Sequence, residues 1–395
     1  MSTPESAGSA ASRLPKEENP SNTIGKLDLK CIASTGDSFC KTIAECNPDT
    51  SYPAVPGRPQ FGDESNCFQS AQLSADGATL VTLNEDWGLR SFLLLPSLPI
   101  RLQNVFAPYT HATYPWLNPR TEAYIAPHSL LFTPDGTRFV AGAKDALAVF
   151  DSSRDGQGPV AEVRTRRGRR ERKYGTSWGE CAGLVSALAM RGDDALLAAG
   201  TTRRQIGFWA AGGLGEVVAT FDLGLEDGGG KGEMGNGVSQ LKWSRDGRYL
   251  FVAERQSDGL AVYDIRVQGR RLAWLKGRRA DTTQELGFDV VGEDAGCDVW
   301  AGGTDGVVRV WREASGKEGE VQPDGEVQVA RGELTASVAK RYELTGDAAS
   351  VSNVLIHEES LITTCGQRRC PQDLVPGEEC EVAARLENTI KVWSL

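Results

Sequence analysis

The sequence predicts an all-β protein in which short sheets stack around a ring, and the stretch 128–151 shows why. Three short strands follow one another there. Pro134-Asp135-Gly136 supplies the first turn, because proline presets φ and glycine tolerates a positive φ, and Lys144-Asp145 supplies the second. The runs 130–132 and 147–150 are apolar at consecutive positions, so we expect both strands to bury both faces between neighbouring sheets.

This three-strand unit recurs along the chain. Close copies surround Asp76, Asp193 and Asp246, and two poorer copies end at Trp311 and Trp393. Each copy gives an apolar strand, a turn of the Asp-Gly kind, a strand of small residues, a second turn and a strand that ends in an aromatic residue. This period is typical of WD-repeat β-propeller blades, in which no sheet is stable alone. We expect residues 61–395 to form one such propeller of six or seven blades.

Residues 1–60 are rich in Ser, Pro, Glu and Gly, so we expect most of this region to be disordered. The exception is the segment 27–34, which has the composition of a strand. The last blade ends at Leu395, two residues after Trp393, and therefore lacks an outer strand of its own. The segment 27–34 is the candidate strand that closes the ring; a last blade of three strands is the alternative.

The spacing between the first inner strands is too short. Only 61 residues separate Cys67 from His128, whereas two blades need about 80 to 90. The intervening sequence has no Asp-Gly turn and no closing aromatic-acid pair. We expect a short or missing blade at 100–127.

The composition restricts the function classes. The net charge is -10, so any nucleic-acid site must be local. No apolar run reaches the length of a signal peptide or of a membrane span, and we expect a soluble intracellular protein. The nine cysteines are expected to be reduced and separate. Cys365, Cys370 and Cys380 lack a CxxC pair and need His357 as a fourth ligand, so we expect no metal.

Catalysis has little support in the sequence. None of the three histidines stands in a metal-ligand spacing. Residues 175–179 match the G-x-S-x-G pattern, but they follow an arginine-rich loop instead of a buried strand. The glycine run 228–237 lacks the Lys-Ser/Thr ending of a phosphate loop. We expect no enzyme activity, no cofactor and no small-molecule substrate.

Four short motifs, in this order within a propeller, carry a specific resemblance: TYPWLN, APHSLLFTPDG, VYDIR and GQR. Over residues 60–395 the chain resembles the telomerase Cajal body protein family, also called WD-repeat protein 79, as a fungal member. The resemblance implies a nuclear scaffold that binds small nuclear RNA and its ribonucleoprotein proteins, with Cajal-body guide-RNA, telomerase or splicing roles. In that family a complete repeat lies between the YPW-like and PHSL-like segments. This chain lacks it, through a true loss or an omitted exon.

Arginine pairs indicate where RNA would bind. Second-to-third-strand turns and blade-to-blade loops share one face of a propeller, and the pairs fall in these connections. Guanidinium groups pair with phosphates and stack on bases, and aromatic side chains add stacking. The candidate RNA-binding residues are Arg166, Arg167, Arg169, Arg170, Arg203, Arg204, Arg278, Arg279, Arg368, Arg369, Tyr174 and Trp178. Arg270-Arg271 falls on the opposite face.

Two alternatives stand beside the RNA hypothesis. A basic loop can also be a solvated insert or a nuclear-import signal, and acidic residues such as Glu226 and Glu378 share the predicted face. The sequence Tyr263-Asp264-Ile265-Arg266 is similar to the W-D-x-R box by which some propellers dock as cullin-RING ligase substrate receptors. Asp264 and Arg266 would then mark a protein-interaction adaptor without RNA contact. The other interpretation of this box is structural, because its Asp and Arg can tie strand ends together.

Overall fold

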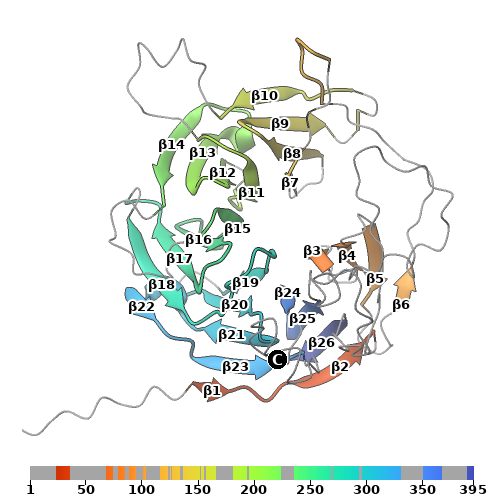
Figure 1. The fold of residues 1–395 in the computed structure, drawn as a ribbon, viewed down its shortest axis with the longest axis vertical. Coiled ribbons are helices and arrows are strands. Elements are labelled where there is room, and N and C mark those ends of the chain that lie inside the picture. Colours follow the sequence, from red (N-terminus) through yellow and green to blue (C-terminus); the bar gives the residue numbers. More distant parts are fainter. Residues whose placement is uncertain are drawn as a thin grey trace, which may run out of the picture.

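The structure, a computed structural model, describes residues 24–35, 68–73, 79–84, 89–94, 101–103, 116–122, 125, 127–133, 137–151, 153–154, 157–165, 181–193, 195–223, 235–267, 270–292, 296–330, 350–366 and 389–395. Within these ranges the strands form six sheets arranged around a ring, which confirms the predicted WD-repeat propeller (Figure 1). The helical elements there are two single 3₁₀ turns, Ala211–Gly213 and Ala314–Gly316. No helix in the described ranges has the length and hydropathy needed to cross a membrane.

Each sheet has four antiparallel strands, and we number the sheets in chain order. The first contains β3 (Phe68–Leu73), β4 (Thr79–Asn84), β5 (Leu89–Leu93) and β6 (Arg101–Gln103). The second contains β7 (Ser129–Phe132), β8 (Arg138–Ala143), β9 (Ala146–Asp151) and β10 (Ala161–Arg164). The third contains β11 (Val185–Met190), β12 (Leu196–Thr201), β13 (Gln205–Ala210) and β14 (Val217–Asp222).

The remaining three sheets follow the same order from the inner to the outer strand. The fourth contains β15 (Val238–Trp243), β16 (Tyr249–Glu254), β17 (Gly259–Asp264) and β18 (Arg271–Lys276). The fifth contains β19 (Phe288–Val291), β20 (Asp298–Gly302), β21 (Val307–Trp311) and β23 (Gly325–Gln328). The sixth contains β24 (Val351–His357), β25 (Ser360–Cys365), β26 (Ile390–Ser394) and β2 (Lys30–Ser34).

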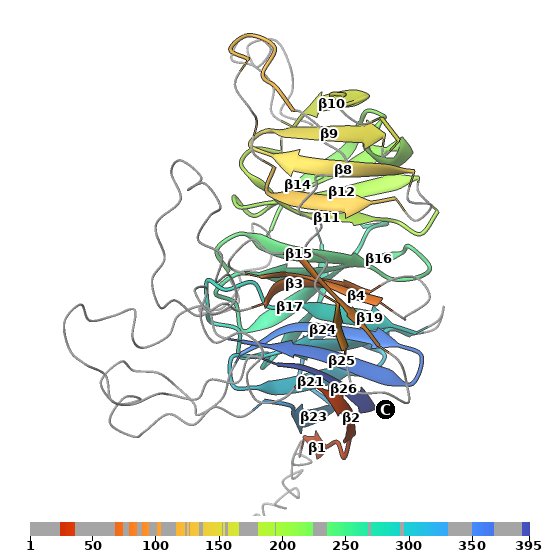
Figure 2. The same ribbon diagram turned by 90° about the vertical axis from the view of Figure 1, so that its right-hand side faces the viewer.

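An N-terminal segment supplies the outer strand of the sixth sheet, at the place where the sequence indicates a ring-closing strand. β2 pairs antiparallel with β26, and Ile390 N donates to Thr35 Oγ1 at 3.0 Å. Just before it, β1 (Gly25–Lys26) pairs parallel with β23, so the segment lies across the outer edges of two sheets. A third added strand, β22 (Gly319–Val321), pairs parallel with β18. In the side view of Figure 2, β1 and β2 lie at the end of the molecule opposite β10.

The core lies between consecutive sheets, and the small-residue strand makes close packing possible. Gly142, Gly200 and Gly302 each end or nearly end the second strand of their sheet. A Cβ added at Gly200 would lie 2.5 Å from Val238 Cγ1 of the next inner strand, and one at Gly142 would lie 2.5 Å from Val185 Cγ1. Glycine therefore lets the inner strands β11, β15 and β24 approach the preceding sheet closely.

The second sheet is less buried than its neighbours on one face of its inner strand. The strand β9 buries both faces, as predicted. The same prediction is wrong for β7, because Leu130 and Phe132 are each 49% exposed. The reason is visible in Figure 1, where the first and second sheets stand apart while the other consecutive sheets lie side by side. The stretch expected to hold a short or missing blade contains β6 and residues from Trp116 onward, and residues 104–115 lie outside the described ranges.

Candidate nucleic-acid interface

The turns between second and third strands and the connections between sheets meet at one end of the ring, which we call the loop face. Its described turns are 144–145, 202–204, 255–258 and 303–306, and its longest described connection is 277–287. Backbone hydrogen bonds join them: Arg278 N donates to Asp258 O at 2.8 Å, and Thr304 N donates to Arg279 O at 2.9 Å. Of the described arginine pairs, 203–204 and 278–279 lie on this face, and 270–271 lies at the opposite end of the ring.

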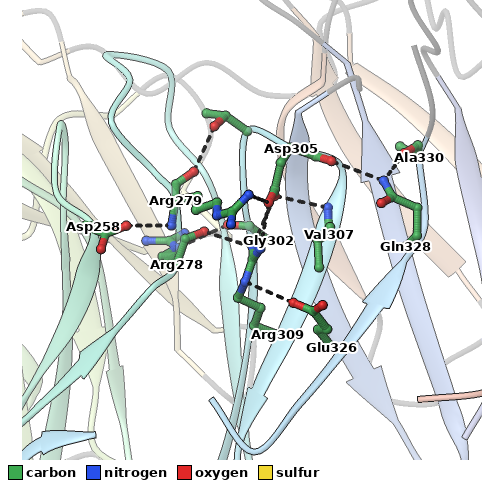
Figure 3. Close-up of polar contacts among 11 residues, drawn as sticks. Asp258, Arg278, Arg279, Gly302, Asp305, Val307, Arg309, Glu326, Gln328 and Ala330 are labelled. Carbon is green, nitrogen blue, oxygen red and sulfur yellow. Dashed lines mark hydrogen bonds and ion pairs between the residues drawn. The ribbon is translucent and has the colours of Figure 1, made fainter. Parts of the chain in front are cut away.

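Arg278 is a correction to the predicted RNA-binding set. Its side chain is 1% exposed, and its guanidinium donates to the carbonyl of Gly302 at 3.2 Å (Figure 3). The guanidinium also donates to the carbonyls of Gly287, at 3.4 Å, and Leu286. Burial lowers the pKa of Arg278 to about 10, which leaves the group charged at neutral pH. Arg278 therefore satisfies buried carbonyls between the fourth and fifth sheets and is not accessible to a phosphate.

Arg279, the adjacent residue, has the opposite environment. Its backbone takes the left-handed conformation, with φ 56°, and its N–H donates to Asp258 Oδ1 at 2.9 Å. The side chain points out of the loop face and is 67% exposed, with Nη1 3.3 Å from Asp305 Oδ2 (Figure 3). The exposed part of this guanidinium can contact a polyanion without breaking the core.

Arg309, on β21, is a residue that the sequence pattern did not single out. It is 4% exposed and donates to both carboxylate oxygens of Asp305, at 3.1 and 2.6 Å. A third contact joins Arg309 Nη1 to the carbonyl of Arg278 at 3.4 Å. A charged residue at a core-facing position of the apolar strand Val307–Trp311 is the signal that indicates such a buried pair. The pair fixes the turn beneath Arg279.

Arg203 and Arg204 also differ in their environments. Arg204, with φ 62°, donates to the carboxylate of Glu254 at 2.6 and 3.1 Å, and Glu254 is 7% exposed. This ion pair joins the third sheet to the fourth and raises the pKa of Arg204 through the hydrogen bonds. Arg203 is exposed, and its side-chain stem passes over Gly183. Only Arg203 of this pair is open to a ligand on the loop face.

The carboxyl group of Glu285 also lies on the loop face. Glu285 Oε2 lies 3.7 Å from Arg255 Nη2. Burial raises the pKa of Glu285 to about 7, and Arg255 opposes this shift. Because the side chain of Glu285 is 40% exposed, solvent weakens the effect. Burial therefore opposes ionisation of Glu285, while Arg255 and solvent favour it.

The remaining predicted RNA-binding residues lie outside the described ranges: Arg166, Arg167, Arg169, Arg170, Tyr174, Trp178, Arg368 and Arg369. The residues that flank them are described. Thr165 N donates to Asp145 O at 3.0 Å, and Cys181 N donates to Thr165 O at 2.7 Å. Cys365 and Thr389 exchange backbone hydrogen bonds at 2.8 and 3.2 Å. Both connections that contain these residues therefore start and end on the loop face.

The cysteines considered as metal ligands do not form a described site. Cys365 is buried and reduced, and Cys370 and Cys380 lie outside the described ranges. Among the residues that the structure describes, no group of three or more His, Cys, Asp or Glu side chains has the arrangement of a metal site. Burial also raises the pKa of the Cys181 thiol to about 12, which suppresses its reactivity.

Asp264 and Arg266 lie at the opposite end of the ring from the loop face, where β17 ends. The Arg266 guanidinium donates to the Asp264 carboxylate at 2.9 and 2.7 Å, and Arg266 N donates to Asp264 Oδ1 at 3.0 Å. The side-chain hydrogen bonds lower the pKa of Asp264. The two residues thus bind each other within one turn, which is the geometry of the structural interpretation.

No protein-family model matches the chain. The chain is 33% identical to the guanine nucleotide-binding protein negative regulator 1 of Schizosaccharomyces pombe over 217 residues, 54% of this chain and 50% of that protein. It is 30% identical to telomerase Cajal body protein 1 of Rattus norvegicus over 213 residues, 54% of this chain and 35% of that protein. The human telomerase Cajal body protein 1 is 28% identical over 284 residues, 72% of this chain and 44% of that protein. The matches span half or less of each relative, and they confirm the resemblance to the telomerase Cajal body protein family.

Proposed function

We propose that this WD-repeat scaffold binds small nuclear RNA, or its ribonucleoprotein, in the nucleus and has no enzymatic activity. One observation carries the proposal: every connection that contains a predicted RNA-binding arginine starts and ends on the loop face. Arg203 and Arg279 are exposed there. The names of the Cajal body relatives support a role with telomerase or other nuclear ribonucleoproteins.

Ultraviolet crosslinking in cells tests the RNA contact. The test variant reverses the charge of four arginines, Arg166→Glu, Arg167→Glu, Arg169→Glu and Arg170→Glu, and a second variant combines Arg203→Glu with Arg279→Glu. Both variants are expected to lose most of the crosslinked RNA, because phosphate contacts supply most of the affinity. Arg270→Glu, an exposed change on the opposite face, is the matched control. Equal crosslinking in all three proteins would reject the proposal.

The adaptor alternative has weaker geometric support, because Asp264 and Arg266 already bind each other. RNase treatment of the purified complex separates the two functions. An RNA scaffold releases its protein partners after RNase treatment, whereas an adaptor keeps them. An adaptor would instead lose its partners when Arg266→Ala is introduced. Arg266 lies at the opposite end of the ring, so this variant leaves the loop face unchanged.

A further inference from the structure

An apolar face of the second sheet is open beside the ring axis. Leu130 and Phe132 lie on the same side of β7, and each is 49% exposed. Their cross-strand neighbours on β8 are Ala141 and Phe139, which lie beside them on the same face and are buried. The rings of Phe132 and Phe139 are 5.5 Å apart. We call the surface formed by Leu130, Phe132, Ala141 and Phe139 the open face.

The same two positions are covered in the other five sheets. The cross-strand registers identify the pairs that occupy these positions on each inner strand and face the preceding sheet. They are Ala71 and Leu73, Leu188 and Met190, Leu241 and Trp243, Phe288 and Val290, and Val354 and Ile356. All ten are buried or half-buried, and they pack in the cores between consecutive sheets. In this ring, the position of Leu130 and Phe132 is therefore an interface between sheets.

Among the residues that the structure describes, those that cover this side of the second sheet lie over its outer half. Trp116 is 3% exposed, stands edge-on to Phe150 at 6.1 Å and donates from Nε1 to Glu162 at 3.2 Å. Ile125 joins the same cluster. Trp116 and Ile125 thus cover β8 to β10 and leave the inner strand β7 open.

The connection from the first sheet is too short to form a further four-stranded sheet. Residues 104–115, twelve positions, join β6 to Trp116, whereas a four-stranded blade needs about 40 residues. The open face continues an established type of interface, in which apolar side chains of the preceding sheet cover the two positions on each inner strand. For Leu188 and Met190 these are Leu131 and Val140 of the preceding sheet.

We propose that the open face is a docking site for a β-hairpin of another polypeptide, which presents alternating aliphatic side chains to Leu130 and Phe132. The hairpin takes the place that a neighbouring sheet takes elsewhere in the ring. This binding mode uses the apolar area that β7 exposes, and it is independent of RNA binding at the loop face.

A cyclised peptide with the sequence of residues 127–143 is the probe, because its Leu131 and Val140 cover the equivalent position of the third sheet. Its binding to the full-length protein is measured by fluorescence anisotropy. Saturable binding is expected. The double variant Leu130→Ser with Phe132→Ser is expected to raise the dissociation constant at least tenfold. Val218→Ser, at a side chain that is 61% exposed on the outer strand β14, is the matched control and is expected to bind as the unchanged protein does.

The single variant Leu130→Ser, which keeps the contact between Phe132 and Phe139, serves if the double variant does not fold. A photo-crosslinking amino acid at position 130 then reports what covers the face. Crosslinks to Leu131 or Val140 of the peptide support the docking site. The proposal is overturned if the peptide does not bind or binds all variants equally. It is also overturned if position 130 crosslinks to residues 36–67 or 104–115 of the same chain, or to a second copy, in place of the peptide.

Discussion

At the scale of single residues, the structure separates neighbours that the sequence treats as equal. Arg278 and Arg279 share a residue type and a connection between sheets, so a charge pattern assigns both to the RNA-binding surface. The difference arises from three carbonyls, those of Leu286, Gly287 and Gly302, which lie close enough together to need one multivalent donor. These carbonyls come from two positions of the chain, 286–287 and 302, and Arg278 from a third, so no local pattern predicts that they converge.

The two arginines are therefore expected to respond differently to the same substitution. Arg278→Met removes the side-chain donor shared by three buried carbonyls and is expected to lower the free energy of unfolding by about 3 kcal/mol. Arg279→Met removes an exposed guanidinium and is expected to change it by less than about 0.5 kcal/mol. Urea unfolding followed by tryptophan fluorescence measures both values. Similar losses for the two variants would contradict the assignment of Arg278 to the core and Arg279 to the surface.

At the scale of strands, the sequence pattern predicts much of the fold. The repeated order of apolar strand, turn, small-residue strand and aromatic ending locates the six sheets, because each sheet needs these residue types to pack on both sides. The pattern does not give the reason for the small residues at the end of the second strand. That reason is the close approach of the next inner strand, which becomes visible only when two sheets are placed together.

Gly200 and Val238 test this close approach. Gly200→Ala places a Cβ 2.5 Å from Val238 Cγ1 and is expected to cost about 1 to 3 kcal/mol. Val238→Ala, although destabilising alone, removes the contacts with both Cγ atoms and leaves only the contact with the Val238 Cβ, at 2.8 Å. Because this relieves part of the clash, the double variant is expected to lose about 1 kcal/mol less than the two single variants together. Thermal or urea unfolding of the four proteins gives this coupling. Gly316→Ala is the control, because a Cβ at Gly316 would meet no atom within 4 Å. Additive losses at Gly200 and Val238 would show that the two sheets do not meet there.

At the scale of the whole molecule, the N-terminal strand is the feature that sequence reasoning located best. β2 lies within the segment 27–34, which the sequence indicates as a ring-closing strand, and it pairs with β26 as the outer strand of the sixth sheet. The open face could not be predicted, because the apolar run 130–132 is typical of a strand buried on both faces. The exposure of Leu130 and Phe132 depends on where the first and second sheets lie, which only the structure shows. The short spacing before His128 is the one sequence signal for it.

The charge of the whole molecule also determines how it meets RNA. Because the net charge is -10, long-range attraction to a polyanion is weak, and the affinity must come from a few contacts on the loop face. Each phosphate contact with a single strand contributes about -0.7 to the slope of log K against log salt. Arg203→Glu with Arg279→Glu is therefore expected to reduce that slope by about 1.4, and Arg270→Glu on the opposite face is expected to leave it unchanged. Anisotropy titrations with a labelled single-stranded RNA between about 50 and 200 mM salt measure the slope. An equal slope for all three proteins would mean that the exposed arginines of the loop face do not contact the RNA backbone.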